Sequence, residues 1–397
     1  MHVSLRTAIL LISLTVGAHH ATAAESSEKT LSMVMFTKLS VVENLMSQQE
    51  FEKAQKKLTR MLSDLPDRPT DKAYVYHSQA TLFLYQEKYK DAQKYFTLSY
   101  ELDALNDKTS ASVAQTLASL AMHFGDFRKA ITYLNDYLAV AEAPDKSVLL
   151  ALGTAHYQIK EYAKAINPLK QAKAQFEPDK SVYLLLFSSY YELEQMTNAA
   201  GVLEQVIRLW PDETEYWLQL ASIYLEQKKV TKSLEVLQLA FAQNLLLKEG
   251  ELLQFVYTLY EKGLPFKASR VLQTGFDKGL IKKNYKNYSL LASLLVDARE
   301  SDLALDAFTL ASQQASDGKE DLYIAQIYFE RESFRKAISH AGDALNKGIK
   351  NPGNAYMLMA ASHHELDELK QAKANLLKAS KYKKTKQAAE QWLGGLE

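Results

Sequence analysis

The sequence predicts an all-α fold, a right-handed α-solenoid of about ten helical hairpins that ends in a capping helix. The first observation is a small residue that recurs ten times at separations of 33 to 38 residues. The second is its setting, which reads roughly aromatic, two polar, small, apolar, as in residues 162–166 (YAKAI) and 334–338 (FRKAI). A period of this length is typical of stacked helical hairpins. The recurring residues are Ala54, Ala92, Ala130, Ala165, Ala199, Ser233, Ala268, Ala304, Ala337 and Ala372.

Within one unit, the apolar spacing follows helix geometry. Residues three and four apart lie on one helix face, so such residues form a stripe that neighbouring helices must bury. The small residue lets two helices cross closely, and a larger one would cost about 1–3 kcal/mol by overpacking. Residues 215–241 show the pattern most clearly and resemble the tetratricopeptide repeat, W-x2-L-G-x2-Y…A-x3-F-x2-A. The matching residues are Trp217, Leu220, Ala221, Tyr224, Ser233, Leu237 and Ala240.

The remaining units are placed by the same signals. Residues 35–62 form a first hairpin without an aromatic signature, and longer turns at 64–71 and 102–110 fit the two widest gaps. Later turns carry helix breakers such as Pro211 and Gly318. Residues 386–393 read as a capping helix whose Trp392 covers the last hairpin. No linker divides the chain, so we expect residues 30–397 to form one continuous array.

The N-terminus reads as a signal peptide, residues 1–23. Arg6 precedes an apolar run of eleven residues at 8–18, and cleavage is expected after Ala23 or Ala24. The alternative is a retained membrane anchor, but this run is shorter than the roughly 20 residues that span a bilayer. We therefore expect an exported protein with no membrane span after cleavage. Zero cysteines exclude disulfides and a lipobox.

Neither charge nor motifs point to nucleic acid or catalysis. The chain has 47 Lys+Arg and 47 Asp+Glu, so it lacks the basic excess of nucleic-acid binders. It contains no G-x-S-x-G, H-E-x-x-H or P-loop motif, so we expect no catalytic residue, cofactor or metal site. His363 and His364 are adjacent and cannot share a helix face, which favours a surface pair. Four other histidines stand alone on predicted helices: His77, His123, His156 and His340.

One pattern concerns partner binding. In tetratricopeptide arrays the first helix of each unit lines the concave surface, and its late positions point into the groove. Seven residues before the recurring small residue, the fifth to tenth units all carry a carboxylate, and the preceding position is mostly aromatic or apolar. The carboxylates are Glu192, Glu226, Glu261, Asp297, Glu330 and Glu365. The preceding residues, from the fourth unit on, are Tyr157, Tyr191, Leu225, Tyr260, Val296, Phe329 and His364.

We interpret this pattern as a groove for an extended or helical partner with Lys/Arg and apolar side chains. Tyr157, Tyr191, Tyr260 and Phe329 would be the anchors. The alternative is a set of solvated polar positions, yet carboxylates at helix C-termini cost about 0.3–1 kcal/mol each, which argues against chance. Acidic residues at these places also argue against a clamp that binds the C-terminal carboxylate of a partner.

Several stretches resemble one group of exported tetratricopeptide proteins, those encoded beside a second TonB–ExbB–ExbD energy-transduction system of Gram-negative bacteria. They include residues 165–172 (AINPLKQA), 216–221 (YWLQLA), 263–272 (GLPFKASRVL), 343–354 and 387–393 (QAAEQWL). Pro168 and Pro265 are unusual for a generic repeat.

This resemblance implies a periplasmic scaffold that contacts TonB, an ExbB- or ExbD-type component or a receptor during iron–siderophore or haem uptake. The Pro- and Lys-rich linkers typical of TonB-type proteins would suit an acidic groove. Two alternatives remain, a scaffold for envelope assembly or polysaccharide export, and an enzyme or metal carrier.

Overall fold

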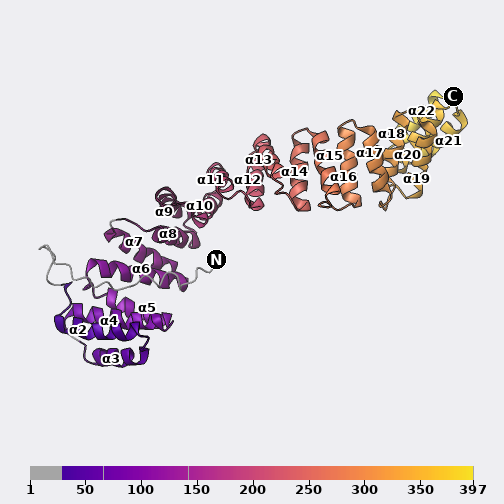
Figure 1. Ribbon diagram of the computed structural model, residues 1–397. Coiled ribbons are helices and arrows are strands. Elements are labelled where there is room, and N and C mark those ends of the chain that lie inside the picture. The colour runs from indigo at the N-terminus through magenta and orange to yellow at the C-terminus, as the bar shows by residue number, and fades with distance from the viewer. Residues whose placement is uncertain (1–28, 66, 142, 397) are drawn as a thin grey trace. The chain divides into compact units, whose positions relative to one another are not determined.

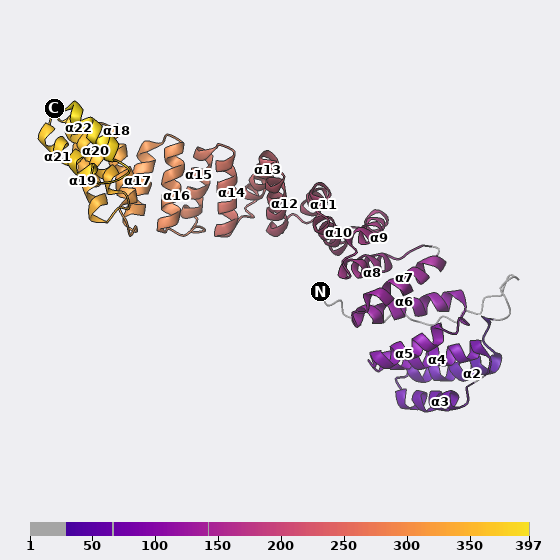
Figure 2. The ribbon, with the colours of Figure 1, turned by 180° about the vertical axis from the view of Figure 1, so that it is seen from behind.

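The computed structural model describes residues 29–65, 67–141 and 143–396, and helices are its only regular elements. The expected signal peptide lies outside these residues. The helices form two compact units that divide between Glu177 and Pro178. Within each unit every helix packs against the next along the chain (Figures 1 and 2). None of the described helices is long and apolar enough to cross a membrane.

The helices pair into ten hairpins, four in the first unit and six in the second, and α22 follows the last hairpin. The first unit contains α2 (Met33–Ser47), α3 (Phe51–Ser63), α4 (Pro69–Tyr85), α5 (Tyr89–Tyr100), α6 (Asp107–His123), α7 (Phe127–Val140), α8 (Lys146–Gln158) and α9 (Tyr162–Gln175). The second contains α10 (Lys180–Glu192), α11 (Met196–Leu209), α12 (Thr214–Glu226), α13 (Val230–Ala242), α14 (Glu249–Glu261), α15 (Pro265–Asp277), α16 (Tyr285–Asp297), α17 (Ser301–Ser312), α18 (Lys319–Glu330), α19 (Phe334–Asn346), α20 (Pro352–Glu365), α21 (Leu369–Ala379) and α22 (Lys386–Gly395).

The recurring small residue occupies the same place in every hairpin. It is the fourth residue of the second helix, from Ala54 in α3 to Ala372 in α21. All ten of these side chains are fully buried, at 0% exposure. The prediction of an all-α solenoid is confirmed, because each position that the periodicity singled out is a closed contact between helices.

The turn inside each hairpin is also repeated. After the first helix one residue takes a positive φ, and the N–H groups of this residue and the next bond back to carbonyls in the last turn of the helix. This pattern is the Schellman motif, which usually employs glycine. Only Gly125 and Gly263 meet that preference. The other eight turns use Gln49, Glu87, Lys160, Glu194, Lys228, Arg299, Glu332 and Asp367.

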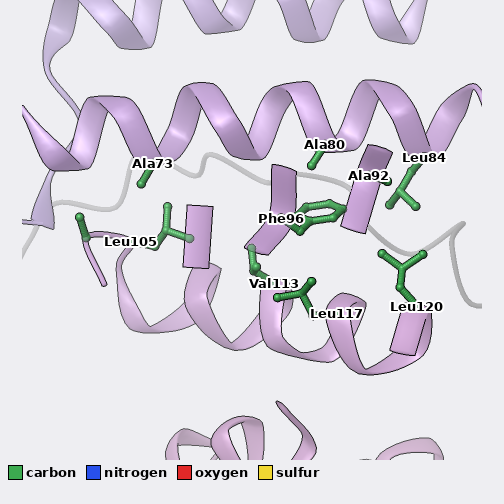
Figure 3. Close-up of a cluster of buried hydrophobic side chains, with 10 residues drawn as sticks. Ala73, Ala80, Leu84, Ala92, Phe96, Leu105, Val113, Leu117 and Leu120 are labelled. Atoms are coloured by element: carbon green, nitrogen blue, oxygen red, sulfur yellow. The ribbon is translucent and has the colours of Figure 1, made fainter. Parts of the chain in front are cut away.

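The first unit has its main core between α4, α5 and α6. Phe96 lies at its centre, among Leu84, Leu117 and Leu120 (Figure 3). His77 is buried beside this core, with its ring 5.7 Å from that of Phe96. Burial disfavours the charged imidazolium and lowers the pKa of His77 to about 4.

Helix α22 covers the C-terminal end of the second unit. Trp392 packs with Ala360, Leu376 and Ala379, so the last hairpin is covered by this helix. The position of Trp392 follows from α22, which places Ala389 in the buried contact and Trp392 three residues later on the same face.

Replacing Ser233 with alanine should stabilise the second unit. The Ser233 hydroxyl is fully buried and has no hydrogen-bond partner among the described residues, whereas nine other units have alanine at this place. An unsatisfied buried hydroxyl costs about 1–3 kcal/mol, so we expect a gain of about 1 kcal/mol, measured by hydrogen exchange in α12 and α13. Ser233→Leu should instead destabilise the same helices. A loss of stability in Ser233→Ala would contradict this account.

The first unit should lose stability in mild acid because of His77. In the unfolded chain an imidazole titrates near its ordinary pKa of 6.5, and in the fold near 4. The unfolded state therefore binds the extra proton between these values, so this contribution is full above pH 6.5 and falls as the pH drops towards 4. Over this pH range the contribution of His77 to the free energy of unfolding should fall by about 3 kcal/mol.

The measurement is urea unfolding of wild type and His77→Phe at pH 7.5 and pH 4.5, followed by hydrogen exchange in α4 and α5. The other titrating groups are common to both proteins, so the advantage of the variant should grow as the pH falls. A difference between the two proteins that is the same at both pH values would disprove the role of His77.

Candidate functional site

The six predicted carboxylates hold one structural place in the second unit. Each is the last residue of the first helix of a hairpin, from Glu192 at the end of α10 to Glu365 at the end of α20. All six side chains belong to exposed residues. Their common place follows from the Schellman turn, because the residue with positive φ always comes two positions later. The carboxylates therefore form a regular row along one edge of this unit.

The members of this row differ in their contacts. Asp297 accepts a hydrogen bond from the Tyr260 hydroxyl at 2.8 Å, which raises the pKa of Tyr260. A Glu365 oxygen lies 3.9 Å from Nδ1 of His364. The other four, Glu192, Glu226, Glu261 and Glu330, form no ion pair with another described residue.

The predicted aromatic anchors are exposed to different degrees. Tyr191 and Tyr260 are 42% and 46% exposed, which leaves their rings available to a partner. Phe329 is half-buried and packs edge-on against Phe334, with ring centroids 5.5 Å apart. Tyr157 lies in the first unit, where its ring packs against that of Tyr162, so the structure does not place it beside the other three.

The structure contains a groove of about 680 Å³ across the first helices α10, α12 and α14. It brings together two of the predicted residues, Tyr191 and Glu226, and none of the other eight. The remaining lining residues are Phe187, Thr214, Glu215, Leu218, Gln219, Ser222, Ile223, Lys248 and Glu251. Leu218, Ser222 and Glu226 are four residues apart, so following this one face of α12 from Glu226 would have found them in the sequence.

Two aromatic rings and two carboxylates that form no ion pair within the described part of the chain give the groove its character. One of these carboxylates, Glu215, accepts a hydrogen bond from the Gln219 amide at 3.1 Å. Phe187 and Tyr191 lie one turn apart on α10 with ring centroids 5.9 Å apart. Glu251 also faces the groove, but it accepts backbone N–H groups at the start of α14 and pairs with Lys248 at 3.2 Å. Glu215 and Glu226 are therefore the carboxylates available to a cationic ligand.

The adjacent histidines do not converge on one ligand. Nδ1 of His363 lies 2.6 Å from a Glu368 oxygen, whereas the His364 ring packs against Trp392 at 5.8 Å. The bond from His363 and the contact with Arg335 lower the pKa of Glu368. The two histidines therefore have separate partners, as expected, but only His364 lies at the surface, because the His363 side chain is just 12% exposed.

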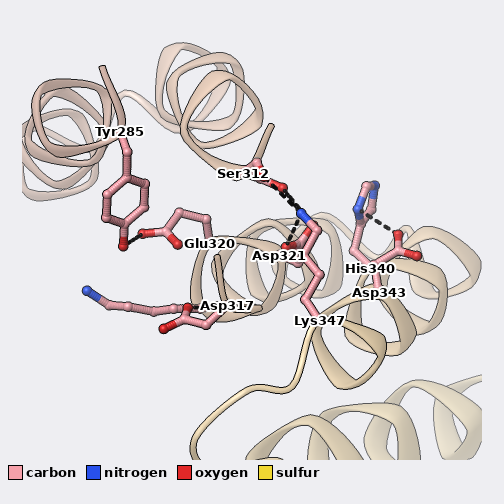
Figure 4. Close-up of polar contacts among 9 residues, drawn as sticks. Tyr285, Ser312, Asp317, Glu320, Asp321, His340, Asp343 and Lys347 are labelled. Carbon is pink, nitrogen blue, oxygen red and sulfur yellow. Dashed lines mark hydrogen bonds and ion pairs between the residues drawn. The ribbon is translucent and has the colours of Figure 1, made fainter. Parts of the chain in front are cut away.

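Another histidine has neighbours that the sequence did not indicate. Asp321 of α18 meets His340 and Asp343 of α19, with ligand atoms within 4.8 Å of one another, a spacing that could hold a metal ion. Lys347, however, places its ammonium 2.8 Å from Asp321 and also bonds Ser312 (Figure 4). The Lys347 ammonium already neutralises Asp321, the buried carboxylate of these three residues. The cluster therefore fits an ion pair better than a metal site.

A family model described as the cilia and flagella-associated protein 70 C-terminal domain, a tetratricopeptide-repeat model, matches residues 77–327. The chain belongs to this family. No curated protein matches it. Tetratricopeptide-repeat proteins are generally non-catalytic scaffolds for protein–protein interaction, and this chain shares that architecture.

Three solved structures are similar to this chain in fold at low sequence identity. YrrB, described as a TPR protein with an unusual peptide-binding site, is 15% identical, with a TM-score of 0.37 and coverage of 46% of this chain and 89% of its own. A tetratricopeptide repeat protein from Parabacteroides merdae is 14% identical, with a TM-score of 0.37 and coverage of 75% and 98%. The C-terminal part of a repeat protein from Cytophaga hutchinsonii is 15% identical, with a TM-score of 0.39 and coverage of 69% and 94%. These values say nothing about function.

Removing the ammonium of Lys347 should destabilise the hairpin of α18 and α19. Asp321 is 4% exposed, and Lys347→Met would leave its charge without the Lys347 ammonium. Breaking a fully buried pair costs about 3–5 kcal/mol, and because Lys347 is partly exposed we expect about 2 kcal/mol, measured by hydrogen exchange in α18 and α19. Lys350→Met, on the exposed turn that follows, is the matched control. Equal stability of the two variants would contradict the role of the pair.

Proposed function

We propose that this protein is a non-catalytic periplasmic scaffold that binds a partner protein in the groove of its second unit. The observation that carries the proposal is the combination of exposed Tyr191 with Glu215 and Glu226, two carboxylates without an ion pair to any residue that the structure describes, in one groove. Aromatic side chains at the centre of an interface supply most of its binding energy. Carboxylates beside them favour a partner with Lys or Arg and speed its association.

The pathway that we propose is TonB-dependent uptake of iron–siderophore or haem. Support comes from the stretches that resemble exported tetratricopeptide proteins of TonB–ExbB–ExbD systems, and from the signal-peptide pattern at residues 1–23. The partner would be TonB, an ExbB- or ExbD-type component or a receptor. A Pro- and Lys-rich linker of the TonB type has the charge that the groove favours. The alternative is a scaffold for envelope assembly or polysaccharide export.

Affinity purification from lightly cross-linked envelopes of the native bacterium tests both parts. The full chain, tagged at its C-terminus, should recover TonB-, ExbB- or ExbD-type proteins. Tyr191→Ala combined with Glu226→Lys should reduce this recovery about tenfold or more, because the variant loses an anchor and reverses a charge.

The matched control is Leu239→Ala combined with Glu235→Lys, two exposed residues of the second helix α13. Equal recovery by both variants would refute the groove as the binding site. Recovery of envelope-assembly or polysaccharide-export proteins instead would refute the TonB pathway and leave the scaffold role standing.

A further inference from the structure

A hollow lined by lysines lies in the second unit, at the turns that join α12 to α13 and α14 to α15. It has a volume of about 610 Å³. Its lining residues are Lys228, Lys229, Val230, Thr231, Lys232, Glu261 and Lys262. Four ammonium groups against one carboxylate give this lining a formal charge of +3. We call it the lysine hollow.

The four lysines have no acidic partner among the described residues, although the chain as a whole is neutral. All four are exposed. Glu235 lies one turn after Lys232 on α13, but the two form no ion pair. Glu261 is the one acidic residue of the lining, so the hollow itself keeps a positive charge.

Two of the lysines are held in place before any ligand arrives. Lys262 donates a hydrogen bond from Nζ to the Thr231 hydroxyl at 2.7 Å. Nζ of Lys232 lies 5.3 Å from the centre of the Tyr224 ring, and Tyr224 is itself buried. A cation over an aromatic face is attracted to the ring. This pre-arrangement reduces the ordering that a ligand would otherwise have to impose.

We propose that the lysine hollow binds an acidic peptide segment of the partner protein, that is, a short run of Asp or Glu. The inference rests on the proposed scaffold function, since it assigns a second contact to the same kind of partner. The chemistry favours carboxylates over phosphate for two reasons. No arginine lines the hollow, and arginine is the residue that recognises phosphate in a two-pronged manner. Glu261 also repels a densely charged anion more than it repels spaced carboxylates.

The lysine hollow changes the character of the carboxylate row. Glu261 stands in the row, yet it lies among four ammonium groups of the neighbouring turns. The row is therefore acidic at Glu192 and Glu226, basic around Glu261, and acidic again from Asp297 onwards. A partner that lies along this edge should carry basic, then acidic, then basic residues.

The test uses the full chain and two fluorescent peptides at low salt, with binding followed by anisotropy. Hexaglutamate probes the lysine hollow, and hexalysine probes the groove. Wild type should bind hexaglutamate, and Lys228→Glu combined with Lys229→Glu should weaken that binding about tenfold or more, because like charges then face each other. The matched control is Lys282→Glu combined with Lys283→Glu, an adjacent pair of exposed lysines before α16.

The other outcomes would each contradict either the lysine hollow, its assignment to carboxylates, or the groove. No binding of hexaglutamate by wild type, or an equal loss in both double variants, would refute the lysine hollow. Tripolyphosphate that binds more tightly than hexaglutamate and displaces it would refute the assignment to carboxylates. Hexalysine binding that is lost in Glu226→Lys, without any hexaglutamate binding, would leave the groove standing alone. Hexaglutamate binding without any hexalysine binding would refute the groove and keep the lysine hollow.

Discussion

The close crossing of the two helices at the buried small residue is the contact on which the rest of the structure depends. All ten of these side chains are fully buried, so a larger residue here would overpack the crossing. The crossing sets how the second helix leaves the turn, and so where the next hairpin stacks. Because it is repeated, the ends of the first helices fall at equivalent places. The regular carboxylate row of the second unit is a consequence of that repetition.

The period and the helices were predictable from the sequence because they depend on residues close together in the chain. Ala165 and Trp217 carry signals that are visible within one repeat. The turns were less visible, since Lys160 and Glu332 adopt a left-handed conformation for which only glycine would have given a signal. The groove was predicted only in part. Tyr191 and Glu226 were named, and Phe187 and Leu218 lie one and two turns before them on the same helices, but only the packing of the hairpins brings α10 and α12 together in one groove.

Contacts between residues far apart in the chain were not predictable from the sequence, whether they lie within one hairpin or between two. Asp321 and Lys347 are held together by the packing of α18 on α19, and no local pattern indicates that pair. The uniform acidic row that the periodicity suggested is interrupted in the structure, because Lys228 and Lys229 come from the preceding hairpin and lie against Glu261. Periodicity finds positions that are equivalent along the chain, and it does not show what the next hairpin brings to them.

The interruption of the carboxylate row is off-centre. Two carboxylates, Glu192 and Glu226, precede the lysine hollow, and three, Asp297, Glu330 and Glu365, follow it. An evenly charged edge would accept a chain running in either direction, but this one has a polarity. A segment bound in the reverse direction, with its acidic residues on the lysines, would leave one of its basic residues beyond the row and one carboxylate without a partner. This edge would therefore favour one direction of a bound segment over the other.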